Sequence, residues 1–172
     1  MILTLDPSRQ GSGWNACWEE EWTPWDRGGH SWALYDLLKE HPELSAGSPK
    51  NADGSAAAAA ARKTALVPGC GRGHDVLLLS SFGYDVYGVD YSPKAIEEAR
   101  KNAERKPAVE GLDDDVSRGS DERGSITWLS GDFFEDDWLR EADMSGRKFD
   151  LIYDYTVRSF LPYIHMYISL FR

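Results

Sequence analysis

The stretch TALVPGCGRGHDVLLLSSFGYDVYGVD (64–90) determines the fold of this chain. Its first five residues predict a short buried strand, and the glycines that follow predict a tight loop over 69–73. An apolar run predicts a helix over 75–81 that packs on a sheet, and the alternation over 85–90 predicts a second strand. The stretch therefore predicts a β-loop-α-β unit of a parallel sheet, with Asp90 at the tip of the second strand.

This unit has the chemistry of a nucleoside-binding site. Glycines let the backbone approach a ligand closely, and the free N–H groups at the start of the helix favour an anionic group. The carboxylate of Asp90 can accept hydrogen bonds from two ribose hydroxyls. The loop has the spacing Gly-x-Gly-x-Gly and not the Gly-x-Gly-x-x-Gly of dinucleotide-binding proteins, which favours S-adenosylmethionine over NAD. The alternative is a tight turn between strand and helix that binds no ligand.

Two segments of this unit resemble a known family. VPGCGRGHD (67–75) and GVDYS (88–92) are similar to the thiol, halide and thiocyanate methyltransferases of plants and fungi, in the thiopurine S-methyltransferase-like group of class I methyltransferases. The resemblance implies an α/β fold with a Rossmann-like doubly wound parallel sheet, and S-adenosyl-L-methionine as the cofactor. It also implies that Gly69 and Asp90 bind this cofactor.

A tryptophan-rich segment, GWNACWEEEWTPWD (13–26), precedes the unit. Indole faces attract sulfonium and ammonium groups, so the segment is a candidate cover over a cationic ligand. The alternative is that the tryptophans fasten a terminal arm to the core. The segment is similar to the N-terminal arm of the same family, which closes over the cofactor. That resemblance assigns Trp14, Trp18 and Trp25 to the cofactor pocket and leaves Trp22 outside it.

Capping signals and apolar runs predict the remaining elements. Ser31 is a candidate N-cap for a helix that ends at Glu40. Ser92 is a candidate N-cap for a second helix, which begins with Pro93 in its first turn and continues through Arg105. The third and fourth strands are expected within residues 125–130 and 148–156. The strand order would be 3-2-1-4, with ligands at the carboxyl ends of the strands.

Composition divides the chain into four parts. These are an N-terminal aromatic arm and helix (1–44), a low-complexity linker (45–62), a cofactor-binding core (63–156) and an atypical apolar tail (157–172). The polar residues between the second helix of the core and the third strand are expected to form a solvated surface loop.

Polar and aromatic residues follow the third and fourth strands. Asp132 and Phe133 stand where an acid can bind an adenine amino group and a ring can stack on adenine; the alternative is a helix cap followed by core packing. The resemblance assigns both residues to adenine and assigns Tyr155 to the cofactor pocket. Asp154 lies at the end of the fourth strand, at the position where cofactor and substrate would meet. The alternative for Asp154 is a structural role.

The tail VRSFLPYIHMYISLFR (157–172) departs from the family pattern, in which a helix and three more strands follow. We hypothesise that it is translated intron and that the product is truncated; a transcript with a junction after the Thr156 codon would support this. The fourth strand would then lie near an open edge of the sheet, which invites pairing with another chain. The tail could add a strand there, form a helix or stay disordered.

Charge and composition limit the partners. The 29 acidic and 19 basic residues give a net charge of −10, which argues against nucleic acid or an anionic membrane. Cys17 and Cys70 are too few for a disulfide framework, and the chain shows neither a signal peptide nor an apolar run that could span a bilayer. We therefore expect the protein to reside in the reducing cytosol. His41 and His74 lack ligand spacing around them, so no metal site is expected.

The sequence therefore predicts a class I S-adenosylmethionine-dependent methyltransferase domain. Its methyl acceptor would be a soft anion such as a thiolate, hydrosulfide, thiocyanate or halide, with thiopurines and larger thiols as further options. Such nucleophiles need little help from a general base, and the sequence offers no nucleophile–base pair, so no catalytic residue is named. Two alternatives stay open: a NAD-dependent oxidoreductase on the same unit, and a non-catalytic cofactor-binding or interaction fragment.

Overall fold

A computed structural model describes residues 10–44, 62–105, 123–155 and 167–169. Nearly all of the predicted linker and of the predicted surface loop lie outside these residues, as does all of the tail except residues 167–169. The described residues include every residue that the sequence assigns to the cofactor site.

Four parallel strands form the sheet, and a fifth strand pairs with its edge. The order is β3-β2-β1-β4-β5, so the predicted order of the first four strands is confirmed. The strands are β1 (Thr64–Pro68), β2 (Asp85–Asp90), β3 (Ile126–Ser130), β4 (Leu151–Asp154) and β5 (Tyr167–Ser169). All pairings are parallel except that between β4 and β5.

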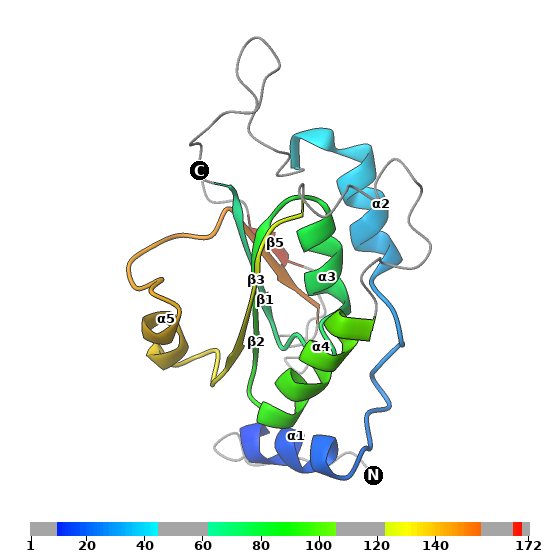
Figure 1. The fold of residues 1–172 in the computed structure, drawn as a ribbon, viewed down its shortest axis with the longest axis vertical. Coiled ribbons are helices and arrows are strands. Elements are labelled where there is room, and N and C mark those ends of the chain that lie inside the picture. The colour runs from blue at the N-terminus through cyan, green and yellow to red at the C-terminus, as the bar shows by residue number, and fades with distance from the viewer. Residues whose placement is uncertain (1–9, 45–61, 106–122, 156–166, 170–172) are drawn as a thin grey trace.

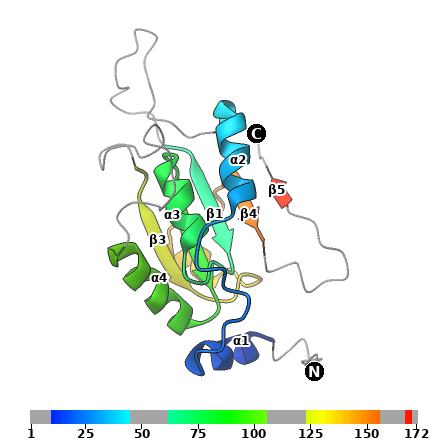
Figure 2. The same ribbon diagram turned by 90° about the vertical axis from the view of Figure 1, so that its right-hand side faces the viewer.

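Helices cover both faces of the sheet, as a doubly wound fold requires. Figure 1 shows α2, α3 and α4 on one face and α5 on the other. The helices are α1 (Gln10–Glu19), α2 (Trp32–Glu40), α3 (His74–Ser81), α4 (Pro93–Arg105) and α5 (Asp137–Glu141), with a short 3₁₀ turn at Pro42–Leu44. Figure 2 shows β1 running toward the end of the sheet where α1 lies.

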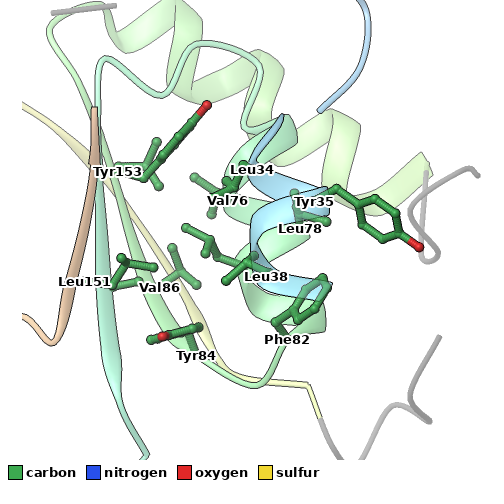
Figure 3. Close-up of a cluster of buried hydrophobic side chains, with 13 residues drawn as sticks. Leu34, Tyr35, Leu38, Val76, Leu78, Phe82, Tyr84, Val86, Leu151 and Tyr153 are labelled. Atoms are coloured by element: carbon green, nitrogen blue, oxygen red, sulfur yellow. The ribbon is translucent and has the colours of Figure 1, made fainter. Parts of the chain in front are cut away.

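Two apolar clusters fill the space between the helices and the sheet. The larger joins α2 and α3 to the sheet, and Leu34, Val76 and Tyr153 are among its fully buried members (Figure 3). The smaller lies on the opposite face, where Trp138 of α5 packs with Leu66 of β1. Each fully buried large apolar side chain contributes roughly 1.5–3 kcal/mol, so these clusters fix the strands and their carboxyl ends.

The predicted helix starts are confirmed by side-chain caps. The Ser31 hydroxyl accepts a hydrogen bond from the Leu34 N–H at 3.3 Å, and the Ser92 hydroxyl accepts one from the Ala95 N–H at 3.3 Å. Each bond satisfies one of the N–H groups that a helix leaves without a partner in its first turn.

The structure of two segments differs from what the sequence predicted or left open. Residues 10–19 of the aromatic arm form the helix α1, which the sequence did not suggest. Of the three conformations open to the tail, Tyr167–Ser169 adopts the strand, which pairs with Ile152 to Asp154 of β4. The outer edge of β4 is therefore covered over these residues, and the expectation of an open edge is wrong there.

Candidate functional site

The glycine loop connects β1 to α3 with a backbone that few other residues could adopt. Gly69, Gly71 and Gly73 have φ angles of 59°, 53° and 74°. A side chain at Gly73 would also overlap the ring of Trp128 on β3. The loop therefore needs glycine both for its left-handed backbone and for its contact with the neighbouring strand.

Asp90, at the end of β2, lies directly beside this loop. One carboxylate oxygen accepts a hydrogen bond from the Gly71 N–H at 2.9 Å, and the other accepts one from the Ser92 N–H at 2.9 Å. Burial raises the pKa of Asp90, while the two N–H donors lower it. Each oxygen keeps a further acceptor position, so the carboxylate can still receive two ribose hydroxyls.

The arm docks on the same edge of the sheet through α1. The Ser92 hydroxyl donates a hydrogen bond to the Asn15 side-chain oxygen at 2.7 Å, which ties α1 to the start of α4. Trp18 is buried, and its ring would lie 3.5 Å from a β-carbon at Gly71. Trp18 therefore packs on the glycine loop itself.

The tryptophans of the arm gather around Trp25. Its ring centroid lies 4.9 Å from that of Trp14, 6.4 Å from that of Trp18 and 5.9 Å from that of Trp22, all edge to face. The structure thus brings together the three tryptophans that were assigned to the cofactor. It also brings in Trp22, although the side chain of Trp22 is 58% exposed.

An ion-pair network holds the end of the arm against the loop. The Arg72 Nε lies 2.5 Å from the Asp26 carboxylate, and its Nη1 lies 3.2 Å from the Glu98 carboxylate on α4. The guanidinium is also 5.5 Å from the Trp18 ring centroid. This network is not evident from the sequence, because Asp26 and Arg72 lie in separate motifs and nothing in either motif identifies the other as its partner.

Asp132 and Phe133 follow β3, next to the end of β2. The Gly131 N–H donates to the Asp90 carbonyl at 2.9 Å, which keeps the two strand ends together. The Asp132 carboxylate accepts a hydrogen bond from the Phe134 N–H at 3.0 Å, so it also stabilises a local turn. The Phe133 ring stacks on Trp138 at 6.1 Å. Contact of Asp132 and Phe133 with adenine stays a prediction.

Tyr155 follows β4, on the opposite side of β1 from Asp90. The Arg27 guanidinium lies 4.5 Å from the centroid of its ring. Arg27 belongs to the arm and was not singled out in the sequence. Asp154, just before Tyr155, is 8% exposed.

The described residues contain no group of three or more His, Cys, Asp or Glu side chains placed to hold a metal ion. Among the helices of this part of the chain, none has the length and apolar character needed to cross a membrane.

Comparison with known proteins gives consistent matches. A family model for Thiopurine S-methyltransferase (TPMT) matches residues 9–163. Thiocyanate methyltransferase 1 of Brassica oleracea is 32% identical over 153 residues, which are 89% of this chain and 51% of that protein. Probable thiol methyltransferase 2 of Arabidopsis thaliana is 31% identical over 152 residues, or 88% of this chain and 50% of that protein. The chain thus spans about half the length of these relatives.

A solved structure has the same fold. It comes from work on the conversion of a disulfide bond into a thioacetal group during echinomycin biosynthesis, and it is 22% identical with a TM-score of 0.55. The match covers 86% of this chain and 47% of that one. The family model covers most of the sequence and agrees with the parallel sheet and its glycine loop, so the chain belongs to the thiopurine S-methyltransferase family.

Proposed function

We propose that this chain binds S-adenosyl-L-methionine and acts in the methylation of small thiols, hydrosulfide, thiocyanate or halide ions. One observation carries the proposal: the Asp90 carboxylate is joined to the glycine loop by the Gly71 N–H, and Trp18 packs on that loop. Asp90, which we assign to ribose, and the aromatic arm both lie at the carboxyl ends of β1 and β2, and this supports a single ligand site there.

The residues on this edge fit an adenosyl sulfonium compound. Asp90 would hold the ribose, and Asp132 with Phe133 would hold the adenine at the neighbouring end of β3. The tryptophan cluster of Trp14, Trp18 and Trp25 offers indole faces to a positively charged sulfur. Trp14 and Trp18 each lie edge to face with Trp25, so the arm is a packed unit whose position is set by the contacts of α1 and Asp26.

The chain's own residues would act by orientation and by exclusion of water. When bound, S-adenosylmethionine supplies a methyl group on a positively charged sulfur and is left as S-adenosylhomocysteine. Soft anions attack without loss of a proton, so a general base is not needed. Alignment of donor and acceptor, together with a site closed by the aromatic arm, accounts for the rate enhancement that this part of the chain would provide.

The acceptor and the compartment are inferred from the relatives and from composition. The relatives are named for thiocyanate and thiol methylation, which supports a small soft nucleophile as the acceptor. Both cysteines are free, and we place the protein in the reducing cytosol. The family match favours a methyltransferase over the NAD-dependent oxidoreductase. The glycine loop supports the same choice, because it lacks the spacing of dinucleotide-binding proteins.

A turnover assay tests the proposal. The purified chain is incubated with S-adenosylmethionine and with hydrosulfide, thiocyanate or iodide, and the volatile methylated products are measured by gas chromatography. We expect methanethiol, methyl thiocyanate or methyl iodide in equal amount to S-adenosylhomocysteine. Binding of S-adenosylhomocysteine without any methylated product would instead identify the non-catalytic alternative.

A further inference from the structure

We propose that Arg27 binds the carboxylate of the amino-acid end of the cofactor, in a group of mixed charges between the glycine loop and the end of β4. This inference rests on the proposed function, because it concerns the same ligand. It adds the residue that recognises the end of the ligand farthest from Asp90.

The position of Arg27 is fixed by its neighbours in the chain. Asp26 forms the ion pair with Arg72 of the glycine loop, and its other carboxylate oxygen accepts a hydrogen bond from the Gly28 N–H at 2.8 Å. The backbone on both sides of Arg27 is therefore tied to the loop. The Arg27 side chain is exposed and lies over Tyr155, whose side chain is 38% exposed. Its guanidinium is thus held at the end of β4 and remains accessible to a ligand.

The start of α3 is not suited to an anion, contrary to the expectation from the sequence. Asp75 occupies the first turn of this helix, and its carboxylate accepts a hydrogen bond from the Ser31 N–H at 2.7 Å. Burial raises the pKa of Asp75, and this N–H and the charge of Arg27 lower it. The Asp75 carboxylate would repel a second anion at the start of this helix. The cation beside it, Arg27, is the better partner for the anionic end of the ligand.

The charges around Arg27 suit a zwitterion. Asp75, Asp154 and Arg27 all lie close enough to the Tyr153 hydroxyl to affect its pKa, which burial above all raises to about 12. One arginine with two aspartates gives an excess of negative charge, which disfavours a phosphate or pyrophosphate group. An α-amino acid carries a carboxylate for the arginine and an ammonium group for the aspartates, so it matches both signs.

A buried hydroxyl also faces these charges. Tyr153 is fully buried, and its hydroxyl makes no hydrogen bond of standard geometry, although the Ser31 side chain is near enough to lower its pKa. Figure 3 shows this hydroxyl pointing away from the apolar cluster. Tyr153 therefore adds a buried hydroxyl to the charges of Asp75, Asp154 and Arg27 at this end of β4.

The test compares two ligands that differ only in the carboxylate. S-adenosylhomocysteine and its decarboxylated analogue are titrated by calorimetry into the unaltered chain, Arg27→Gln and Lys39→Gln. Lys39 is the matched control, because it is another cation over a tyrosine ring, in the last turn of α2. A charge-assisted hydrogen bond to a carboxylate corresponds to a loss of about tenfold in affinity when it is removed.

We expect Arg27→Gln to bind S-adenosylhomocysteine about tenfold more weakly and the decarboxylated analogue as well as the unaltered chain does. Lys39→Gln should bind both ligands normally. Equal weakening toward both ligands, or no weakening toward either, would overturn the role of Arg27 while the proposed function stands. If the unaltered chain binds neither ligand, the proposed function itself fails, and this inference fails with it. Melting temperatures of all three proteins show whether Arg27→Gln is folded.

Discussion

The ends of β2 and β4 contrast in how they are built. At the end of β2, Asp90 is held by N–H groups of the glycine loop and of Ser92, two residues along the chain. At the end of β4, Tyr155 lies under Arg27, which comes from the arm more than a hundred residues earlier. The first end is set by one β-loop-α-β unit, and the second depends on how the arm docks.

This difference explains which parts of the site can be recognised in the sequence. The proposed nucleoside end is encoded in one continuous stretch of sequence, so a loop spacing and one acid identify it. The proposed amino-acid end is assembled from three separate segments, and Arg27, the side chain that we assign to it, has no motif of its own. We expect substitutions at the first end to abolish binding and those at the second to weaken it for particular ligands.

The largest effect is expected from Asp90→Ala. On the proposed function this carboxylate accepts two ribose hydroxyls, so its loss should lower the affinity for S-adenosylhomocysteine by about a hundredfold or more, measured by calorimetry. Asp85→Asn is the matched control, because Asp85 lies at the opposite end of β2 and accepts hydrogen bonds from the Ser125 N–H and hydroxyl at 2.8 and 2.9 Å. It should cost roughly 1 kcal/mol of stability and leave affinity unchanged. If the two substitutions changed the affinity equally, Asp90 would not be a contact of the ligand.

A smaller effect is expected from Arg72→Gln, which breaks the link between the arm and the glycine loop. Because Asp26 and Trp18 both contact this guanidinium, its loss should speed the dissociation of S-adenosylhomocysteine and lower affinity about tenfold. Stopped-flow tryptophan fluorescence measures the rate. Arg140→Gln, which removes an exposed arginine of α5, is the control and should change neither quantity. An unchanged dissociation rate in Arg72→Gln would show that the arm is held by other contacts.

Trp25→Leu should distinguish the charged donor from its neutral product. An indole face favours a sulfonium group by roughly 1 kcal/mol or more over a neutral thioether, so affinity for S-adenosylmethionine should fall about fivefold further than affinity for S-adenosylhomocysteine. Trp22→Leu is the comparison, since Trp22 also touches Trp25 but is the more exposed residue outside the predicted site. It should leave both affinities within about twofold. A larger loss in Trp22→Leu than in Trp25→Leu would reverse the assignment.

The smallest effect expected is a pH dependence that arises from Asp90. Burial raises the pKa of this carboxyl above 3.8, so the folded chain binds the proton more tightly than the unfolded chain. The contribution of Asp90 to folding stability is therefore present at acid pH and is lost as the pH rises through the raised pKa. Ligand binding should show the opposite trend, with affinity for S-adenosylhomocysteine falling on acidification. Calorimetry between pH 7 and about pH 4.5 checks this, and Asp90→Asn should lack the dependence.

The sequence predicted the fold well because its signals are local. Glycines mark the end of β1, at Gly69, and the turn that precedes β2, at Gly83, and the starts of α2 and α4 follow from Ser31 and Ser92. The helix α1 was missed, although Trp14 and Trp18 are four residues apart and so share one helical face. The tryptophans were interpreted as a cover over a ligand or as anchors of a terminal arm, and neither interpretation used their helical spacing.

The contacts between segments could not be predicted in the same way. Asp26 with Arg72 and Arg27 with Tyr155 are pairs that only the docking of the arm creates. The position of Tyr167–Ser169 beside β4 is likewise a long-range pairing, which the alternation of apolar residues in the tail left open. Residues that act through such contacts have no signature in a single sequence.

Titration of the unaltered chain with S-adenosylhomocysteine by calorimetry, with NAD as the control, would decide which cofactor this edge of the sheet binds. Both ligands carry adenine and ribose, but only S-adenosylhomocysteine carries an amino acid in place of a pyrophosphate. We predict binding of S-adenosylhomocysteine with a Kd on the order of micromolar and no measurable binding of NAD. Preferential binding of NAD, or no binding of S-adenosylhomocysteine by a folded sample, would contradict the assignment of this edge of the sheet to S-adenosylmethionine.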